Sequence, residues 1–174
     1  MAKNNVNPVD KECFFDEDKI IVSKTDMKGV VTYANDVFLE IAGYEEEEVI
    51  GQPHSIIRHP DMPRAVFKLL WDYLLAGREI FAYVKNMSRS GAFYWVLAHV
   101  TPTFGQNGEI LGFHSNRRVP CRNAVRKIEP LYAKLLAEEN SHSNKKEGME
   151  SAFRLLVREL EILEISYDEF ILSL

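Results

Sequence analysis

The sequence predicts an α+β domain in which short helices pack on one face of a five-stranded antiparallel sheet. Three observations predict it: β-branched runs lie near the start, helical spacings follow them, and three more strand patterns come in quick succession. Strands gathered at both ends of a domain, with helices between them, favour a sheet covered on one face. We expect a ligand site between the helices and the sheet.

The first two strands form a predicted hairpin. The runs at 20–23 and 30–33 are rich in β-branched residues, which favour strands. The turn over 26–29 separates them and ends in Gly29, which tolerates the positive φ of a tight turn. Short strands joined in this way begin the sheet.

Two short helical segments should follow the hairpin. Asn35 has a side-chain oxygen that can cap a helix over 37–42, and Gly43 can take the left-handed conformation that ends it. A further helical turn is expected over 45–50, with Gly51 as its stop.

A longer helix is predicted over 63–76. Asp61 lies where a helix cap is expected, and Gly77 follows as a stop. Large apolar residues recur in this helix at spacings of three and four, which gives it one apolar face. They are Phe67, Leu70, Trp71 and Leu74.

Three strands complete the predicted sheet, over 80–87, 93–104 and 110–118. The turn segments 88–91 and 106–108 contain the glycine, asparagine and serine residues that hairpins favour. Consecutive hairpins of this kind make the strands antiparallel.

The chain divides into five predicted segments. A polar tail covers 1–19, the core domain covers 20–120, and a linker helix covers 121–138. A flexible, charged linker is expected over 139–148, followed by a helix over 149–174.

The last helix has the spacing of a coiled coil. Its apolar residues alternate between steps of four and three, which is a heptad pattern. They are Met149, Phe153, Leu156, Leu160, Leu163, Tyr167, Phe170 and Leu174. The helix carries a net charge of −4, so a complementary partner surface should be basic. The pattern predicts a partner-binding helix, and the alternative is that the helix folds back as a cap on its own sheet.

Composition and charge exclude several classes of protein. The 174 residues are 46% apolar and 27% charged, as in a globular domain, and a net charge of −5 leaves no basic excess for nucleic acid. The polar residues 1–10 contain no apolar core for a signal peptide or membrane span. Cys13 and Cys121 are interpreted as free thiols. We expect a cytoplasmic protein.

The loop over 51–63 is the strongest candidate for ligand binding, because its three prolines stiffen it and lower the entropy cost of ordering polar groups. Arg58 can hold phosphate through its fork of donors, and His59 can hydrogen-bond a phosphate, a ribose or a ring edge. Asp61 has a plain role as a helix cap, which is compatible with ligand contact.

Catalytic and metal chemistry find no support in the sequence. His54 and His59 are five residues apart in a loop, a spacing that matches no standard metal pair. No nucleophile, base and orienting acid can be grouped by spacing, and no glycine-rich phosphate loop is present. Trp71 is either part of the core or a stacking platform for a flat aromatic cofactor.

These motifs together resemble the PAS sensory domains, and among them the flavin-binding PAS domain of bacterial aerotaxis (energy-taxis) receptors. The resemblance covers about 25–135. Its motifs are Thr25-Asp26, Tyr33-Ala34-Asn35-Asp36, Gly43-Tyr44, Gly51-Gln52-Pro53-His54, Arg58-His59-Pro60-Asp61-Met62-Pro63, Val84-Lys85-Asn86, Gly91, Tyr94-Trp95-Val96 and Glu129-Pro130-Leu131-Tyr132. The proline-rich loop followed by Tyr-Trp-Val is specific to this subgroup, whereas the asparagine and glycine-tyrosine positions are general PAS features.

The resemblance implies a PAS fold that binds FAD without a covalent bond and reports its redox state, as a sensor rather than an enzyme. By matched motif, it implies seven cofactor-binding positions, with His54 the weakest among them. They are Arg58, His59, Asp61, Trp71, Asn86, Asn35 and His54.

The chain also departs from related families. Light-sensing PAS domains use a cysteine beside the flavin, and the corresponding loop here has His54 instead. No membrane or methyl-accepting signalling segment is present, so the signal is expected to leave in trans. The expected recipient is a membrane-bound methyl-accepting signalling protein, or a second copy of the chain, docked through 149–174.

Three alternatives remain open from the sequence. A haem-binding PAS gas sensor could use His59 or His99 as an axial ligand. A small flavin oxidoreductase would need a substrate site beside the flavin. A cofactor-free interaction module would use the PAS core as a platform for association.

Overall fold

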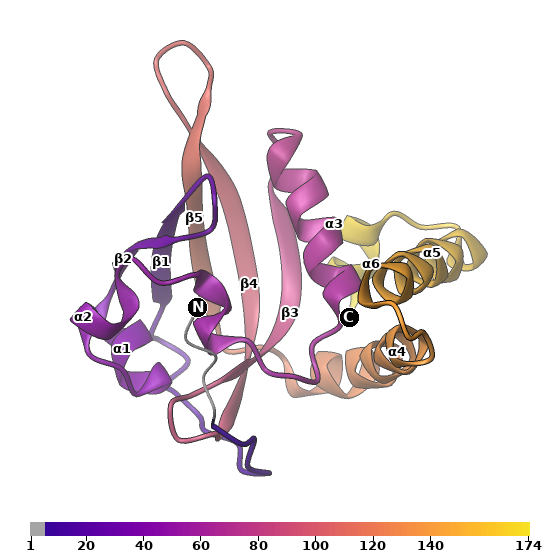
Figure 1. Cartoon of the computed structure of the whole chain (residues 1–174), viewed down its shortest axis with the longest axis horizontal. Helices are drawn as coiled ribbons and strands as arrows, with labels where there is room; N and C mark the ends of the chain where they lie inside the picture. Colours follow the sequence, from indigo (N-terminus) through magenta and orange to yellow (C-terminus); the bar gives the residue numbers. More distant parts are fainter. Residues whose placement is uncertain (1–5) are drawn as a thin grey trace.

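The computed structural model describes residues 6–174 and is built around one five-stranded antiparallel sheet with the strand order β2-β1-β5-β4-β3 (Figure 1). The strands are β1 (Ile21–Asp26), β2 (Val31–Ala34), β3 (Ile80–Met87), β4 (Phe93–Phe104) and β5 (Ile110–Arg118). The predicted α+β class is confirmed, and the last three strands have the predicted bounds. Their alternating patterns and glycine-containing turns leave few other pairings.

Short helices follow β2 and then a longer one returns to the sheet. They are α1 (Asp36–Ala42), α2 (Glu46–Val49), the 3₁₀ helix η1 (His54–Ile57) and α3 (Arg64–Leu75). α1 and α2 lie near β1 and β2, whereas α3 lies over β3 and β4 (Figure 1). This arrangement leaves room for a cavity between α3 and the sheet.

Asn35 caps α1, as its side chain predicts. Its Oδ1 accepts hydrogen bonds from the amides of Phe38 (3.1 Å) and Val22 (2.9 Å), and its Nδ2 donates to the carbonyl oxygen of Ile20 (2.8 Å). The side chain therefore ties the start of α1 to β1. Gly43 ends the helix with a φ of 71°.

The cap of α3 differs from the prediction. Pro63 occupies the cap position, and the carboxylate of Asp61 instead accepts a hydrogen bond from Lys85 Nζ at 2.6 Å. A cap from the local sequence comes from the residue directly before the helix, and α3 begins too late for Asp61 to serve in this way. The carboxylate of Glu139, 74 residues further on, accepts from the amide of Ala65 at 2.8 Å.

Three helices form the C-terminal part: α4 (Arg122–Asn140), α5 (Lys145–Leu163) and α6 (Tyr167–Ser173). The structure differs here from the expected linker and single heptad helix. α4 continues through Pro130 to Asn140, and a short turn then leads into α5. α5 ends at Glu164, whose φ is 54°, and Ser166 caps α6 through its side chain. The change of direction splits the heptad pattern between two helices.

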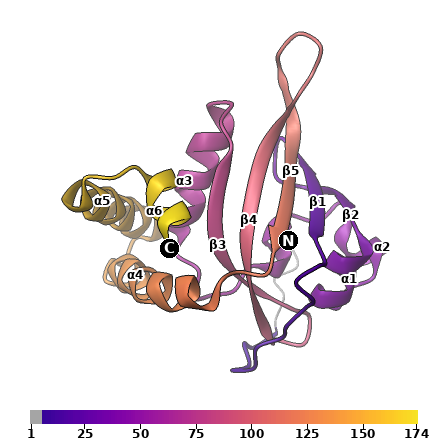
Figure 2. The same ribbon diagram turned by 180° about the vertical axis from the view of Figure 1, so that it is seen from behind.

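Most of the apolar seam of these helices packs within the chain. α5 packs against α4 and α3, and α6 packs against β3. Viewed from behind, α4 and α6 lie beside β3 and away from β1 and β2 (Figure 2). Ala152 and Leu156 of α5, and Tyr167 and Ile171 of α6, are buried. Most of the seam expected to bind a partner is thus covered in cis, since heptad spacing suits any apolar groove of the right length. Leu163 of the seam stays exposed.

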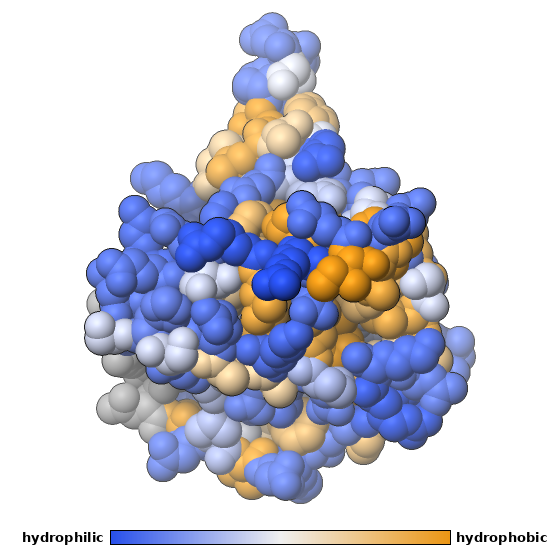
Figure 3. All heavy atoms as spheres, turned by 90° about the vertical axis from the view of Figure 1, so that its right-hand side faces the viewer, coloured by the Kyte–Doolittle hydropathy of each residue, from blue (hydrophilic) through white to orange (hydrophobic). Residues whose placement is uncertain are grey.

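The face that carries the C-terminal helices is largely hydrophilic and holds an exposed hydrophobic patch (Figure 3). Exposed aliphatic side chains on α5 and α6 include Ile162, Leu163 and Leu172, each more than half accessible. Part of the apolar surface of 149–174 therefore stays available to solvent. None of the helices in the described residues is both long and apolar enough to cross a membrane.

The N-terminal tail is docked along the domain. The amide of Cys13 donates to the carbonyl oxygen of Phe93 (2.7 Å), which extends the sheet beside the start of β4. Next to it, the carboxylate of Glu12 accepts two hydrogen bonds from the guanidinium of Arg122, at 2.6 and 2.8 Å. Because Arg122 is the first residue of α4, the tail joins the sheet to the C-terminal helices.

A buried hydrogen bond fixes α4 on the sheet, and its loss gives a first prediction. The hydroxyl of Tyr132 donates to the carbonyl oxygen of Tyr83 at 2.8 Å, beside the stacked ring of Trp95. Tyr132→Phe should lower the free energy of unfolding by about 1–2 kcal/mol, because the carbonyl stays buried without its partner. Urea denaturation measures this change. Tyr33→Phe, at an exposed ring on β2, should leave the midpoint unchanged. Equal midpoints for the two variants would contradict the role of this hydrogen bond.

Candidate functional site

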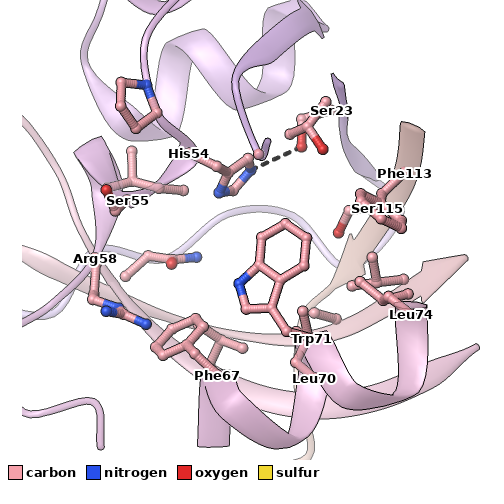
Figure 4. A pocket seen from close by; sticks show the side chains of 18 of the residues that line it. Ser23, His54, Ser55, Arg58, Phe67, Leu70, Trp71, Leu74, Phe113 and Ser115 are labelled. Carbon is pink, nitrogen blue, oxygen red and sulfur yellow. Dashed lines mark hydrogen bonds between the residues drawn. The ribbon is translucent and has the colours of Figure 1, made fainter. Parts of the chain in front are cut away.

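A cavity of about 310 Å³ lies between the inner face of the sheet and α3 (Figure 4). Side chains two residues apart on a strand share a face, and such residues on four strands line it. They are Ser23 and Thr25 of β1, Val84 and Asn86 of β3, Ala98 and Val100 of β4, and Phe113, Ser115 and Arg117 of β5. The cavity is therefore framed by regular secondary structure.

One wall of the cavity is apolar and partly aromatic. α3 supplies Phe67, Leu70, Trp71 and Leu74, the residues whose spacing predicts its apolar face. The indole of Trp71 meets the ring of Phe113 edge-on, with centroids 5.3 Å apart. A Cβ atom on Gly29 would lie 3.1 Å from that indole, and the φ of Gly29 is +76°. Glycine is thus required in the β1–β2 turn both for its conformation and for the approach of Trp71.

The opposite wall carries a buried guanidinium. Arg117 Nη2 donates to Ser23 Oγ at 3.0 Å and lies 2.7 Å from His54 Nε2. Because arginine can only donate, His54 Nε2 is the acceptor and the ring proton lies on Nδ1. Burial lowers the pKa of Arg117 to about 10, which leaves it charged at neutral pH. The wall therefore presents a cation held by neutral groups.

His54 is neutral at physiological pH. Burial, and then the charge of Arg117, lower the pKa of His54 to about 3 from its ordinary value of 6.5. The ring lies at the cavity with Ser23 close by (Figure 4), and Ser23 Oγ is 3.0 Å from Nε2. His54 thus supplies a fixed acceptor to Arg117 rather than a second charge.

Three buried polar atoms around the cavity have no hydrogen-bond partner among the described residues. They are Arg117 Nη1, Asn86 Nδ2 and Ser115 Oγ. All three side chains line the cavity. A buried polar group without a partner costs about 1–3 kcal/mol, so three in one cavity call for an explanation. Acceptor atoms of a bound ligand would satisfy them together.

Arg58 brings a second cation to the cavity. It follows η1, and its guanidinium lies over the ring of Phe67, 3.5 Å from the centroid. Burial, followed by the charge of Arg64, lowers the pKa of Arg58 to about 10. Lys28, in the β1–β2 turn, is an exposed cation that also lines the cavity. Arg58 and Lys28 make the approaches to the cavity electropositive.

The structure brings four of the seven predicted site residues to the cavity: His54, Arg58, Trp71 and Asn86. It places the other three elsewhere. Asn35 ties α1 to β1. Asp61 pairs with Lys85, and its amide donates to Nδ1 of His59 (3.1 Å). His59 is buried, and burial followed by the charge of Lys85 lowers its pKa. His59 and Asp61 therefore hold the loop that carries Arg58.

Sequence analysis misses Arg117, Ser115 and Ser23. A signal for two of them was available: Phe113, Ser115 and Arg117 alternate along β5 and so share one face. Phe113 marks that face as inward, and a serine and an arginine on an inward face are unusual enough to indicate a site.

No group of three or more histidine, cysteine, aspartate or glutamate side chains in residues 6–174 is arranged to hold a metal ion. His99 lies away from the cavity, stacked on Phe81 with ring centroids 4.1 Å apart, and bonded to Glu79 at 2.8 Å.

The buried neutral state of His54 predicts a pH dependence of stability. Below about pH 6.5 the unfolded chain protonates His54, whereas the folded protein does not until the pH nears 3. Stability should therefore fall as the pH falls, by about 1.4 kcal/mol per pH unit from this group. His54→Gln keeps an acceptor and cannot titrate, so it should show a shallower slope. Urea denaturation between about pH 6 and pH 4 measures both slopes. Equal slopes would contradict the buried neutral imidazole.

Sequence comparison places the chain among known sensors. A family profile described as the PAS fold matches residues 31–117. The chain is 38% identical over 125 residues to the aerotaxis receptor of Escherichia coli (strain K12), which covers 72% of this chain and 24% of the receptor. It is 28% identical over 91 residues to the nitrogen fixation regulatory protein of Klebsiella pneumoniae, which covers 52% of this chain and 18% of that protein. The chain thus spans less than a quarter of these two relatives.

Solved structures agree on the fold. The light-state structure of the photoreceptor Aureochrome1 LOV matches with a TM-score of 0.53 at 22% identity, over 72% of this chain and 93% of that one. A light-oxygen-voltage domain studied with a flavin analogue matches with a TM-score of 0.54 at 19% identity, over 71% and 87%. The matched family profile, the aerotaxis-receptor relative and the five-stranded sheet agree with the motifs of the sequence, and the chain belongs to the PAS family.

Proposed function

We propose that this protein is a cytoplasmic redox sensor that binds FAD in the cavity and signals its redox state in trans to a partner. The observation that supports it most is the convergence of Arg117 Nη1, Asn86 Nδ2 and Ser115 Oγ, all without partners, on one cavity with a tryptophan in its wall. A flavin ring has a flat apolar body and an edge of carbonyl and nitrogen acceptors. The cavity therefore offers the donors and the faces that a flavin needs.

The chemistry of the donors fits a flavin in detail. Arg117 and Asn86 can each donate a hydrogen bond to a ring-edge oxygen or nitrogen, and Ser115 can donate or accept. The apolar residues of α3, with Trp71 at their centre, would hold the ring by its faces (Figure 4). Bound flavin would supply one-electron and two-electron redox chemistry.

FAD is proposed over FMN because the motifs resemble those of aerotaxis-receptor PAS domains, and the two cations outside the buried wall suit its two phosphates. A cavity of about 310 Å³ is small for a whole dinucleotide, so the phosphates of FAD would lie at the approaches to the cavity. Arg58 and Lys28 are there, and cations of this kind favour phosphate. His59 and Asp61 contribute by holding the Arg58 loop against β3 through Lys85.

Sensing rather than turnover is proposed because Asn86, one of the polar groups at the cavity, lies on a strand that contacts the C-terminal helices. Asn86 lies on β3, which pairs with β4 and packs against α6. A change of charge or protonation at the ring edge changes what the amide of Asn86 can bond, so the amide can reorient. β3 would carry that change toward the C-terminal helices.

The proposed partner is a membrane-bound methyl-accepting signalling protein or a second copy of the chain. The E. coli relative is named an aerotaxis receptor, which supports a role in energy taxis. The segment 159–174 contains five acidic residues and no lysine or arginine, and its exposed aliphatic residues include Ile162, Leu163 and Leu172. A basic, partly apolar partner surface would complement it.

The alternatives receive less support. A haem ligated by His59 or His99 is disfavoured, because neither lines the cavity, and His54 Nε2 is occupied by Arg117 and Ser23. An interaction module without a cofactor would leave the three unpartnered polar atoms unexplained. A flavin oxidoreductase needs a substrate site, and the cavity is small for two ring systems.

The visible spectrum of the purified protein tests the proposal. We expect a flavin doublet that bleaches on anaerobic reduction with dithionite, and FAD when the released chromophore is identified by mass. Release of FMN alone would contradict the choice of FAD. A Soret band would favour haem, steady NADH oxidation would favour an oxidoreductase, and a colourless protein that binds no added flavin would favour the interaction module.

The first site prediction separates cofactor binding from folding. Arg58→Ala and Trp71→Ala should lower flavin occupancy, because one loses a phosphate-binding cation and the other a stacking surface. The absorbance ratio of flavin to protein measures occupancy, and circular dichroism confirms the fold. Arg89→Ala, which removes a surface pair with Glu48, should keep full occupancy. Normal occupancy in both cavity variants would overturn the site assignment.

The second site prediction concerns the buried charge of Arg117. Arg117→Met should weaken FAD binding at least about tenfold, because a charged donor to the ring edge is lost. The free energy of unfolding should stay the same or rise, since a buried cation without an acid is costly. Calorimetric FAD titration and urea denaturation measure the two effects. Arg118→Met, at the exposed next position on β5, is the matched control. Wild-type FAD affinity in Arg117→Met would exclude the guanidinium from the site.

A further inference from the structure

The N-terminus of α3 is capped by a residue from another helix. The cap position is occupied by Pro63, which has no side-chain acceptor, and Glu139 in the last turn of α4 accepts a hydrogen bond from the amide of Ala65 at 2.8 Å. Glu139 is 7% exposed, so this carboxylate is buried. A carboxylate at a helix N-terminus is favoured both by the helix dipole and by a charge-assisted hydrogen bond. α3 thus depends on α4 for its cap.

The same point also joins α5. Arg64, the first residue of α3, donates from Nη1 to the carbonyl oxygen of Lys145, the first residue of α5 (2.8 Å). Gly148 of α5 lies directly against the backbone of Glu139, and a Cβ atom there would overlap the Glu139 carbonyl oxygen. The last turn of α4 and the first turns of α3 and α5 therefore meet in one contact.

α3 connects this contact to the cavity. Its residues Phe67 and Trp71 line the cavity, two and six residues beyond the capped amide of Ala65. The loop that holds Arg58 leads directly into α3, and the Arg58 guanidinium rests on Phe67. The negative charge of Glu139 acts on Arg58 and raises its pKa, against the effect of burial. A displacement of α3 by a ligand therefore reaches Glu139 through one rigid helix.

We infer that Glu139 is a positioning residue that couples the cavity to the C-terminal helices. Its cap holds α3 in the position in which Arg58 and Trp71 can grip the cofactor, and the same bond holds the α4–α5 turn against α3. Cofactor binding and the docking of α5 therefore stabilise each other, as linkage requires. The inference rests on the proposed FAD site and identifies its route of output. Glu139 and α5, at the far end of that route, lie outside residues 31–117, which match the family profile.

Amide hydrogen exchange on the full chain, with and without FAD, tests the coupling. In the wild-type protein, FAD should slow exchange in the first turns of α3 and α5 by at least about tenfold, because binding favours the docked state. Glu139→Ala should weaken FAD binding about tenfold, the size of a lost cap, and the exchange of α5 should no longer respond to FAD. If Glu139 had only a structural role, Glu139→Ala would speed the amide exchange of α5, and FAD would still slow that exchange as in the wild-type protein.

Two further variants guard the test against misfolding. Glu139→Gln keeps an acceptor oxygen without the charge, so it should restore part of the affinity and part of the response. Glu159→Gln removes an α4–α5 ion pair with Lys134 that does not touch α3, and it should keep the full response. Wild-type affinity and an unchanged α5 response in Glu139→Ala would overturn the inference. If the wild-type protein binds FAD without a change in the hydrogen exchange of α5, the inference fails and the proposed function stands. If the wild-type protein binds no FAD, the proposed function and the inference both fail.

Discussion

The buried guanidinium of Arg117 is the constraint around which the cavity is arranged. Within residues 6–174, no carboxylate lies within ion-pair distance of it, so its charge is met by the hydroxyl of Ser23 and the imidazole of His54. That charge helps to keep His54 neutral, because a second cation so close would be repelled. An isolated buried cation is costly to keep, and it is found where a function uses it. The 3₁₀ helix and β1 are placed so that they satisfy one side of the guanidinium and leave the other facing the cavity.

The C-terminal helices also hold the domain together through contacts between residues that lie far apart in the sequence. α5 and α6 bury an apolar seam against α3, α4 and β3. This packing covers one side of α3. The hydrogen bonds between Glu12 and Arg122 attach the N-terminal tail to the start of α4. The sheet is thereby held by segments from both ends of the chain.

Local patterns predicted the fold well and the long-range contacts poorly. The three last strands were predictable because β-branched residues alternate between turns that contain glycine, and Asn35 because it directly precedes its helix. The position of Asp61 just before the helix favours it as the cap of α3, because the sequence gives no sign that Glu139 lies closer in space. The heptad pattern over 149–174 predicts an apolar stripe. It does not distinguish a stripe that packs against the same chain from one that packs against a partner. The inward face of β5, with Ser115 and Arg117, could be inferred from their alternation with Phe113, whereas the contacts of Arg117 with Ser23 and His54 depend on strand pairing and loop placement that the sequence does not give.

The distance in sequence between α3 and its cap has a consequence for how the protein is made. The Ala65 amide is synthesised 74 residues before Glu139, so α3 leaves the ribosome with its first turn uncapped. Domains fold from the N-terminus as synthesis proceeds, and here the first turn of α3 gains its cap only when the end of α4 has been synthesised. Until then, the amide of Ala65 lacks the acceptor that the folded protein gives it.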